Sequence, residues 1–327
     1  MQPFDYVVPK SHAEASALLL EGNGSVRPFM GGTDLLIRMR GGFVRPERVI
    51  DLKGLPGIRD IQLGEQGWLA IGAACTMNQA ALHPLVQQHY DLLSQACNSV
   101  ASYQLRNRAT VGGNICNASP AADTAPALYC LDAVVELFGP GGTRRVPIAD
   151  FFLGPGKTAL RPGEFLTAIH LPPVPAGARG AFSKLGRTKV GDISMVSVAV
   201  LVDFGFRISD FGLDEARTIH NPAPLRSGDY SPQSTIRNVR IALGAVGPTP
   251  LRASEAEAAL AEDASPDGVR RAADLAAAAA KPIDDIRASA AYRRAMVAVL
   301  VRRGIEAVLV DSPSSVLHPP TSAGAAA

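Results

Sequence analysis

The chain has 327 residues, 47% of them hydrophobic, and a net charge of +2 from 32 basic and 30 acidic residues. This length predicts about two domains, and the balanced charge is unlike that of a nucleic-acid-binding protein. The apolar runs are as short as "VSVAVLV" at 196–202, so we expect no membrane span.

The first elements alternate strand and helix around a pair of glycines. "VRPFMGG" (26–32) predicts a strand that enters a turn, "DLLIRMR" (34–40) a short helix, and "RVIDL" (48–52) a second strand. Residues 58–64 and 68–74 then predict a hairpin.

A mainly helical stretch follows. Thr76 is expected to cap a short helix that runs to Leu82, and residues 84–99 predict a single amphipathic helix that starts at a proline. Residues 122–133 predict a short helix that opens at Asp123. Further predictions are a hairpin around Gly139–Gly142, a strand at 165–173, and a domain boundary in the Pro-, Gly- and Ala-rich segment 172–180.

The second unit begins with strand-like sequences at 181–187 and 194–204, and strand and turn return in "RNVRIALGAVGPTPLRA". Between them lies a long irregular segment, 205–237, which could contact a partner subunit, lie at the flavin entrance or be an unconstrained surface insertion. Helices are predicted at 253–262, 266–280 and 289–310, and the composition of 311–327 is typical of disorder.

Metal and disulfide signals are weak. The four cysteines (Cys75, Cys97, Cys116 and Cys130) include no C-x-x-C pair, and the six histidines are scattered, so no metal site is predicted in this chain. The first residues lack a basic region followed by an apolar one, so we expect no secretory signal and a cytoplasmic location, with other export routes left open.

Two glycine pairs carry the main functional signal. Gly31-Gly32 could be a tight turn, or a place where a phosphate approaches bare backbone amides at the start of a helix. Gly112-Gly113 repeats the pattern, with Thr110, Asn114, Asn117 and Ser119 close by. Two such loops could close on one diphosphate.

"FMGGTDLLIRMR" together with "RNRATVGGNICNASPAADTAPAL" closely resembles the FAD-binding subunit of the molybdenum hydroxylases, a family that includes the medium subunit of carbon monoxide dehydrogenase. The resemblance continues through "FSKLGRTKVGDISMVSVAV" to "DDIRASAAYRRAMVAVLVRRGIEAVL". It implies an α+β fold: an FAD-binding domain at 1–174 with subdomains of about 1–55 and 56–174, then a smaller sheet-and-helix domain at 175–310.

The resemblance also implies the cofactor contacts. These are Phe29, Met30, Gly31, Gly32, Thr33, Asp34 and Leu35 in the first loop; Ala109, Thr110, Gly112, Gly113 and Asn114 in the second; and Cys116, Asn117, Asp123, Ile169 and Lys184 beyond them. Simpler interpretations remain open: a helix cap for Asp123, a small buried residue for Cys116, a core residue for Ile169 and a solvated lysine for Lys184. No Cys or His suggests covalent attachment, so we expect noncovalent FAD.

As the resemblance implies, a large partner subunit holds the molybdenum cofactor, a small one holds two 2Fe-2S clusters, and this chain passes electrons from them to NAD, a quinone, oxygen or another acceptor. A dimer of such heterotrimers is expected.

The cysteine-rich insert of the 4-hydroxybenzoyl-CoA reductase branch is missing, so no iron–sulfur cluster is expected in this chain. We expect no catalytic acid–base pair. Arg106 and Arg108 could face the FAD phosphates, an acidic partner or solvent. The alternatives are a stand-alone flavin oxidoreductase and a scaffold that has lost FAD.

Overall fold

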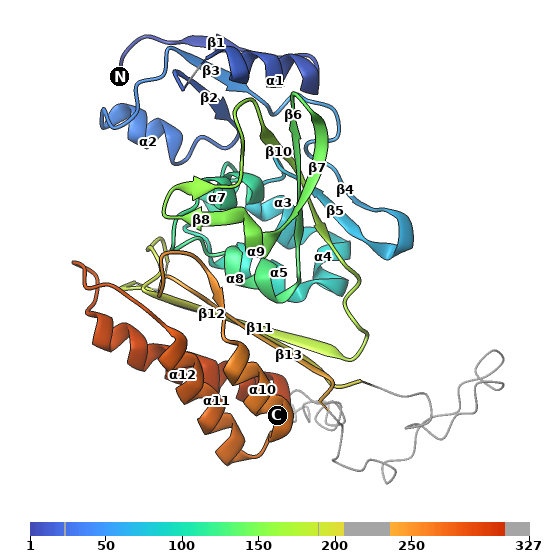
Figure 1. Cartoon of the computed structure of the whole chain (residues 1–327), viewed down its shortest axis with the longest axis vertical. Coiled ribbons are helices and arrows are strands. Elements are labelled where there is room, and N and C mark those ends of the chain that lie inside the picture. Colours follow the sequence, from blue (N-terminus) through green and yellow to red (C-terminus); the bar gives the residue numbers. More distant parts are fainter. Residues whose placement is uncertain (23, 189, 206–235, 311–327) are drawn as a thin grey trace, which may run out of the picture.

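The computed structural model describes residues 1–22, 24–188, 190–205 and 236–310. Most of the irregular segment 205–237 and all of the tail 311–327 therefore lie outside the described residues. Figure 1 shows three layers along the long axis: a small α/β unit at the N-terminal end, a mixed middle unit, and a sheet backed by helices at the C-terminal end.

The N-terminal unit is a three-stranded parallel sheet with the order β1-β3-β2. Ser11 caps α1 by accepting a hydrogen bond from the N–H of Glu14, and α2 ends at Gly41. The predicted strand, helix and strand around the first glycine pair are confirmed. The elements are β1 (Asp5–Val7), α1 (His12–Glu21), β2 (Val26–Phe29), α2 (Leu35–Arg40) and β3 (Arg48–Asp51).

The middle unit is a five-stranded antiparallel sheet with short helices packed against it (Figure 1). Its order is β4-β5-β10-β6-β7, and the two predicted hairpins, β4–β5 and β6–β7, are confirmed. The strands are β4 (Ile61–Leu63), β5 (Leu69–Gly72), β6 (Val134–Gly139), β7 (Gly142–Pro147) and β10 (Phe165–Leu171), with a small pair formed by β8 (Phe152–Gly154) and β9 (Lys157–Thr158).

The helices of this unit correct one prediction. Thr76 caps α3 in a capping box with Gln79, as expected. The single helix predicted at 84–99 is wrong, because Tyr90 leaves helical geometry (φ −137°, ψ 43°) and its buried hydroxyl donates to the carbonyl of Pro172. The helices are α3 (Met77–Leu82), α4 (Pro84–His89), α5 (Asp91–Ser99), α6 (Tyr103–Arg106), α7 (Val111–Cys116), α8 (Ala125–Cys130) and α9 (Ile148–Phe151), with a 3₁₀ turn at Glu65–Gly67.

The C-terminal sheet has the order β11-β12-β13-β14, and its strand β12 is buried on both faces. Along β12, Ala199 and Leu201 point into the core of the middle unit, whereas Val198 and Val200 point into a second core with α10, α11 and α12. This explains the unbroken apolar run in the sequence. The bounds are β11 (Ala178–Leu185), β12 (Val196–Asp203), β13 (Asn238–Gly244), β14 (Leu251–Arg252), α10 (Ser254–Glu262), α11 (Pro266–Ala279) and α12 (Ala290–Val310), which confirms the three predicted helices.

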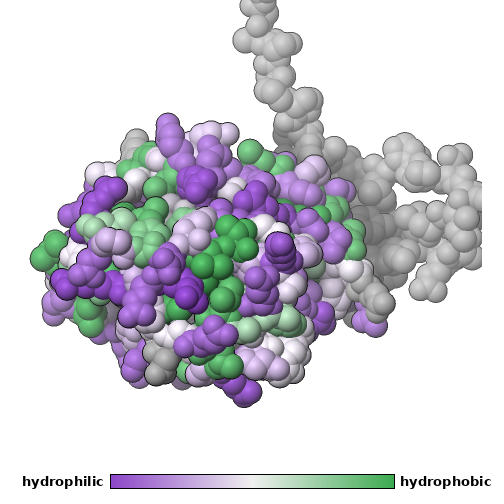
Figure 2. Space-filling view, turned by 90° about the horizontal axis from the view of Figure 1, so that it is seen from above, coloured by the Kyte–Doolittle hydropathy of each residue, from purple (hydrophilic) through white to green (hydrophobic). Residues whose placement is uncertain are grey.

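Two further features concern the hydrophobic surface and the length of the helices. Seen from the N-terminal end, hydrophobic side chains gather in the middle of a largely polar face (Figure 2). Among the described residues, we find no helix with both the length and the hydropathy needed to cross a bilayer.

Candidate functional site

The two glycine loops come from distant parts of the chain and meet. The first follows β2 and leads into α2, and the second runs from the end of α6 into the first turn of α7, which contains Gly112 and Gly113. A Cβ atom on Gly31 would collide with the carbonyl of Arg108, and one on Gly112 would lie 2.6 Å from the carbonyl oxygen of Ala73. Gly32 has a φ of +73°, which favours glycine. Glycine is therefore required at these positions by backbone packing and backbone conformation within the protein itself.

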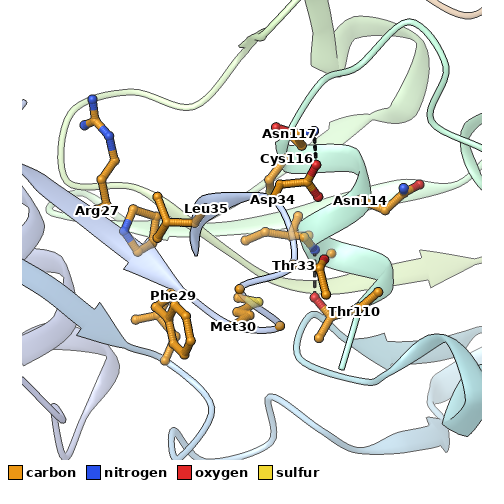
Figure 3. A pocket seen from close by; sticks show the side chains of 18 of the residues that line it. Arg27, Phe29, Met30, Thr33, Asp34, Leu35, Thr110, Asn114, Cys116 and Asn117 are labelled. Atoms are coloured by element: carbon orange, nitrogen blue, oxygen red, sulfur yellow. Dashed lines mark hydrogen bonds between the residues drawn. The ribbon is translucent and has the colours of Figure 1, made fainter. Parts of the chain in front are cut away.

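Both loops line one cleft of about 450 Å³ between the N-terminal unit and the middle unit (Figure 3). Residues 28–35 supply one side of it, and residues around α7 supply the other. Of the predicted cofactor contacts, the lining includes Phe29, Met30, Gly31, Gly32, Thr33, Asp34, Leu35, Ala109, Thr110, Gly112, Gly113, Asn114, Cys116 and Asn117.

The first loop offers backbone donors. The N–H groups of Gly31, Gly32, Thr33 and Asp34 find no hydrogen-bond acceptor among the described residues. Consecutive N–H groups of this kind form a concave site that suits an anion. These four residues all line the cleft, so a bound anion could satisfy their N–H groups.

The second loop differs, because its own fold uses its backbone donors. The N–H groups of Val111 and Gly112 donate to the carbonyls of Cys75 and Ala73, and that of Gly113 donates to the hydroxyl of Thr110. The second loop therefore presents side chains to the cleft rather than free amides. Asn114 lies at the cleft wall, where its Oδ1 accepts a 2.6 Å hydrogen bond from the hydroxyl of Thr124.

A hydrogen bond connects Asp34 of the first loop to Asn117, which follows α7. Oδ1 of Asp34 accepts this hydrogen bond of 3.2 Å from the side-chain amide of Asn117, which Figure 3 shows as a dashed line. Burial raises the pKa of Asp34, and the nearby guanidinium of Arg38 opposes that rise. The residue is still exposed in part, so the carboxylate lies at the edge of the cleft beside the free amides.

The cleft also contains residues that the sequence analysis missed. Arg38 lines it and brings positive charge. Arg27 also lines it, but its guanidinium donates to the carbonyls of Gly24 and Val26. The carboxylate of Glu164 is already paired with Arg144 at 2.7 Å. Arg38 lies four residues after Asp34, and this helical spacing places the two on one face of α2. That spacing was the signal in the sequence. The remaining lining residues are Pro28, Val44, Leu52, Val100, Leu105, Gly156, Leu160, Phe165 and Leu166.

Asp123 and Lys184 form a separate buried pair that does not line the cleft. The ammonium of Lys184 lies 2.6 Å from Oδ2 of Asp123, and the hydroxyl of Ser194 donates to Oδ1 at 2.5 Å. Burial raises the pKa of Asp123, and Lys184 opposes that rise. The helix-cap interpretation of Asp123 is wrong, because α8 begins at Ala125 with Thr124 at its cap position. The solvated interpretation of Lys184 is also wrong, because its side chain is only 13% exposed.

The remaining candidates take other positions. Ile169 is fully buried in the central strand β10 and does not line the cleft. Cys116 is partly buried at the cleft wall, and burial raises the pKa of its thiol to about 12, so the thiol stays protonated. Arg106 is half-buried and donates to Asn78 and to the carbonyl of Val100, whereas Arg108 is exposed. Neither arginine lines the cleft.

The described residues include no cluster of three or more His, Cys, Asp or Glu side chains that could hold a metal ion.

Comparison with known proteins agrees with this architecture. Residues 2–174 match the family described as the FAD binding domain in molybdopterin dehydrogenase, and residues 180–308 match the CO dehydrogenase flavoprotein C-terminal domain. The chain is 33% identical over 305 residues to the carbon monoxide dehydrogenase medium chain of Hydrogenophaga pseudoflava, covering 93% of this chain and 96% of that one. It is 35% identical over 240 residues to the xanthine dehydrogenase FAD-binding subunit of Escherichia coli O157:H7, covering 73% of each.

Solved structures show the same fold. A chain of the carbon monoxide dehydrogenase from Hydrogenophaga pseudoflava superposes with a TM-score of 0.82 at 34% identity, over 95% of this chain and 99% of that chain. A chain of quinoline 2-oxidoreductase from Pseudomonas putida 86 superposes with a TM-score of 0.80 at 25% identity, over 94% of this chain and 98% of that chain.

Proposed function

The chain belongs to the flavoprotein subunits of the molybdenum hydroxylases, and on this premise we propose that it binds FAD noncovalently and passes electrons from the 2Fe-2S clusters of a partner subunit through the FAD to an external acceptor. One observation carries the proposal beyond the family match: four successive N–H groups, from Gly31 to Asp34, line the cleft without an acceptor among the described residues.

The residues of the cleft fit FAD. The diphosphate would accept hydrogen bonds from the free amides of the first loop, near the positive charge of Arg38. The side-chain amides of Asn114 and Asn117 would border the same region. Apolar groups such as Leu105 and Leu160 would cover the flat rings. We further propose that Asp123, Ile169 and Lys184 lie close to the flavin, and that the FAD-binding domain ends near residue 174.

FAD supplies the redox chemistry when it is bound. The chain's own contribution is to hold the phosphates, fix the orientation of the rings and limit the access of water. No acid–base pair is needed for these tasks. The organic substrate would react on a large subunit that holds the molybdenum cofactor, and a small subunit would hold the 2Fe-2S clusters. Two such heterotrimers would associate, and the acceptor could be NAD, a quinone or oxygen.

The test is to purify the chain from its native host and measure its absorption spectrum, its metal content and the mass of the intact complex. We expect a flavin spectrum, FAD released by acid precipitation, and larger and smaller subunits that carry molybdenum and iron. A colourless preparation would contradict FAD binding. Flavin that stays attached to the precipitated chain would contradict noncovalent binding.

A stand-alone flavin oxidoreductase remains the second candidate. Such an enzyme would need a substrate-binding base over the ring, and the described lining of the cleft holds Asp34 and Glu164, of which Glu164 is bound to Arg144. A flavin-loaded chain that copurifies with no molybdenum or iron, and that oxidises a substrate alone, would favour this candidate.

A further inference from the structure

The short helix α2 presents an apolar and basic surface beside the cleft. We call it the α2 face, and it consists of Leu36, Ile37 and Phe43 with Arg40 and Arg45. The side chain of Phe43 is 83% exposed and that of Ile37 is 67% exposed. Figure 1 places α2 on the outer flank of the N-terminal unit, away from the C-terminal sheet. Large apolar side chains exposed together mark contact sites.

The turn that carries Phe43 is fixed. Gly41 donates to the carbonyl of Ile37 and Phe43 donates to that of Arg38, both at 2.9 Å, and Gly42 adopts a φ of +75°. A Cβ on Gly41 would lie only 2.7 Å from the ring of Phe43, so the ring rests on bare backbone and faces outward. An aromatic ring held in place in this way loses little entropy when a partner covers it.

The charges of the α2 face point to the chemistry of that partner. Among the described residues, Arg40 and Arg45 form no ion pair with an acidic side chain within 4 Å. Two such guanidinium groups beside exposed apolar side chains complement an acidic surface with an apolar centre.

We propose that the α2 face docks an acidic, partly apolar protein surface on a partner subunit of the complex. This inference rests on the proposed function. A two-fold contact with a second copy of this chain would place arginines against arginines, which is unfavourable. A membrane is disfavoured because α2 has only six residues, too few to lay a long apolar face into the interface.

The test compares variants within the complex from the native host. Phe43→Ala should weaken assembly at least about tenfold, and Arg40→Glu with Arg45→Glu should slow assembly about tenfold at low salt and less at high salt. FAD content and unfolding temperature should stay at wild-type values. Arg38 is left unchanged because it lines the cleft. Matched controls are Ile286→Ser, at a side chain 96% exposed in the C-terminal unit, and Arg294→Glu on α12.

Wild-type assembly by both α2-face variants, or equal weakening by the controls, would overturn the inference and leave the proposed function intact. Phe43-dependent binding of the chain to vesicles of phosphatidylcholine and phosphatidylglycerol, with assembly unchanged, would assign the α2 face to a membrane instead. A wild-type chain that holds FAD and assembles with no partner would overturn the proposed function, and this inference with it.

Discussion

The side-chain amide of Asn117 donates a hydrogen bond of 3.2 Å to the carboxylate of Asp34, and this bond joins residues that lie 83 positions apart in the sequence. Asn117 follows α7 and Asp34 precedes α2, so the bond connects the two glycine loops at the cleft. Burial raises the pKa of Asp34, although the residue is still partly exposed to solvent. The hydrogen bond therefore joins the two loops at the edge of the cleft.

Asn117→Ala should weaken FAD binding by about 1 kcal/mol, or roughly fivefold, because Asp34 loses its donor and the loops lose a connection. Titration of the apoprotein with FAD, followed by flavin fluorescence, measures the change. Asn98→Ala, at an exposed position on α5, is the control. Unchanged affinity in Asn117→Ala would show that the bond does not hold the loops together.

Gly31→Ala should lower both stability and FAD affinity, because the new methyl group would collide with the carbonyl of Arg108 and force the loops apart. We expect a loss of about 1–3 kcal/mol in the free energy of unfolding. Urea unfolding of the apoprotein and FAD titration measure the two effects. Gly141→Ala is the matched control, because a Cβ there meets nothing within 4 Å. Equal behaviour of the two variants would contradict the close approach of the loops.

Arg38→Ala should weaken FAD binding about tenfold at low salt, since a guanidinium beside the first loop attracts the diphosphate, and the effect should shrink as salt increases. Arg40→Ala is the control, because Arg40 is on the same helix but does not line the cleft. FAD titrations at two salt concentrations decide the matter. A salt-independent loss, or the same loss in both variants, would argue against a phosphate at this place.

Lys184→Met should destabilise the protein by about 3–5 kcal/mol, because it leaves the carboxylate of Asp123 buried and unpaired. Adding Asp123→Asn should restore much of the loss, since both charges are then gone. A double-mutant cycle from urea unfolding gives the coupling energy. Additive losses in the double variant would mean that the two side chains do not interact as a pair.

Glu164→Gln should lower stability by about 2 kcal/mol at pH 7, because Glu164 accepts two 2.7 Å hydrogen bonds from Arg144. These bonds hold the pKa of Glu164 below its ordinary value of 4.5. The stabilisation should therefore be complete above pH 4.5 and disappear as the pH falls through the lower pKa of the folded state. Urea unfolding between pH 7 and pH 3 follows this loss, with exposed Glu255→Gln as the control. A difference from wild type that does not change with pH would contradict the ion pair.

Local sequence patterns were enough for much of the secondary structure. The capping box at Thr76 and the glycine turn between β6 and β7 each act within a few residues. The break at Tyr90 could not be predicted in this way, because its hydroxyl binds a carbonyl 82 residues further along the chain. In the same way, the alternation of β12 side chains between two cores could not be predicted, because both cores form only when the sheet packs between the other units.

The sequence alone determined that two glycine pairs exist and that they belong to a flavin-binding pattern, because residue type and order carry that information. Only the tertiary structure decided how they differ. The amides of the first loop have no acceptor in the part of the chain that the structure describes, whereas those of the second donate to Ala73, Cys75 and Thr110. The tertiary structure also decided that Asp123 pairs with Lys184 and does not cap a helix. Such hydrogen bonds and ion pairs depend on which distant segments come together, and a linear pattern of residues does not specify that.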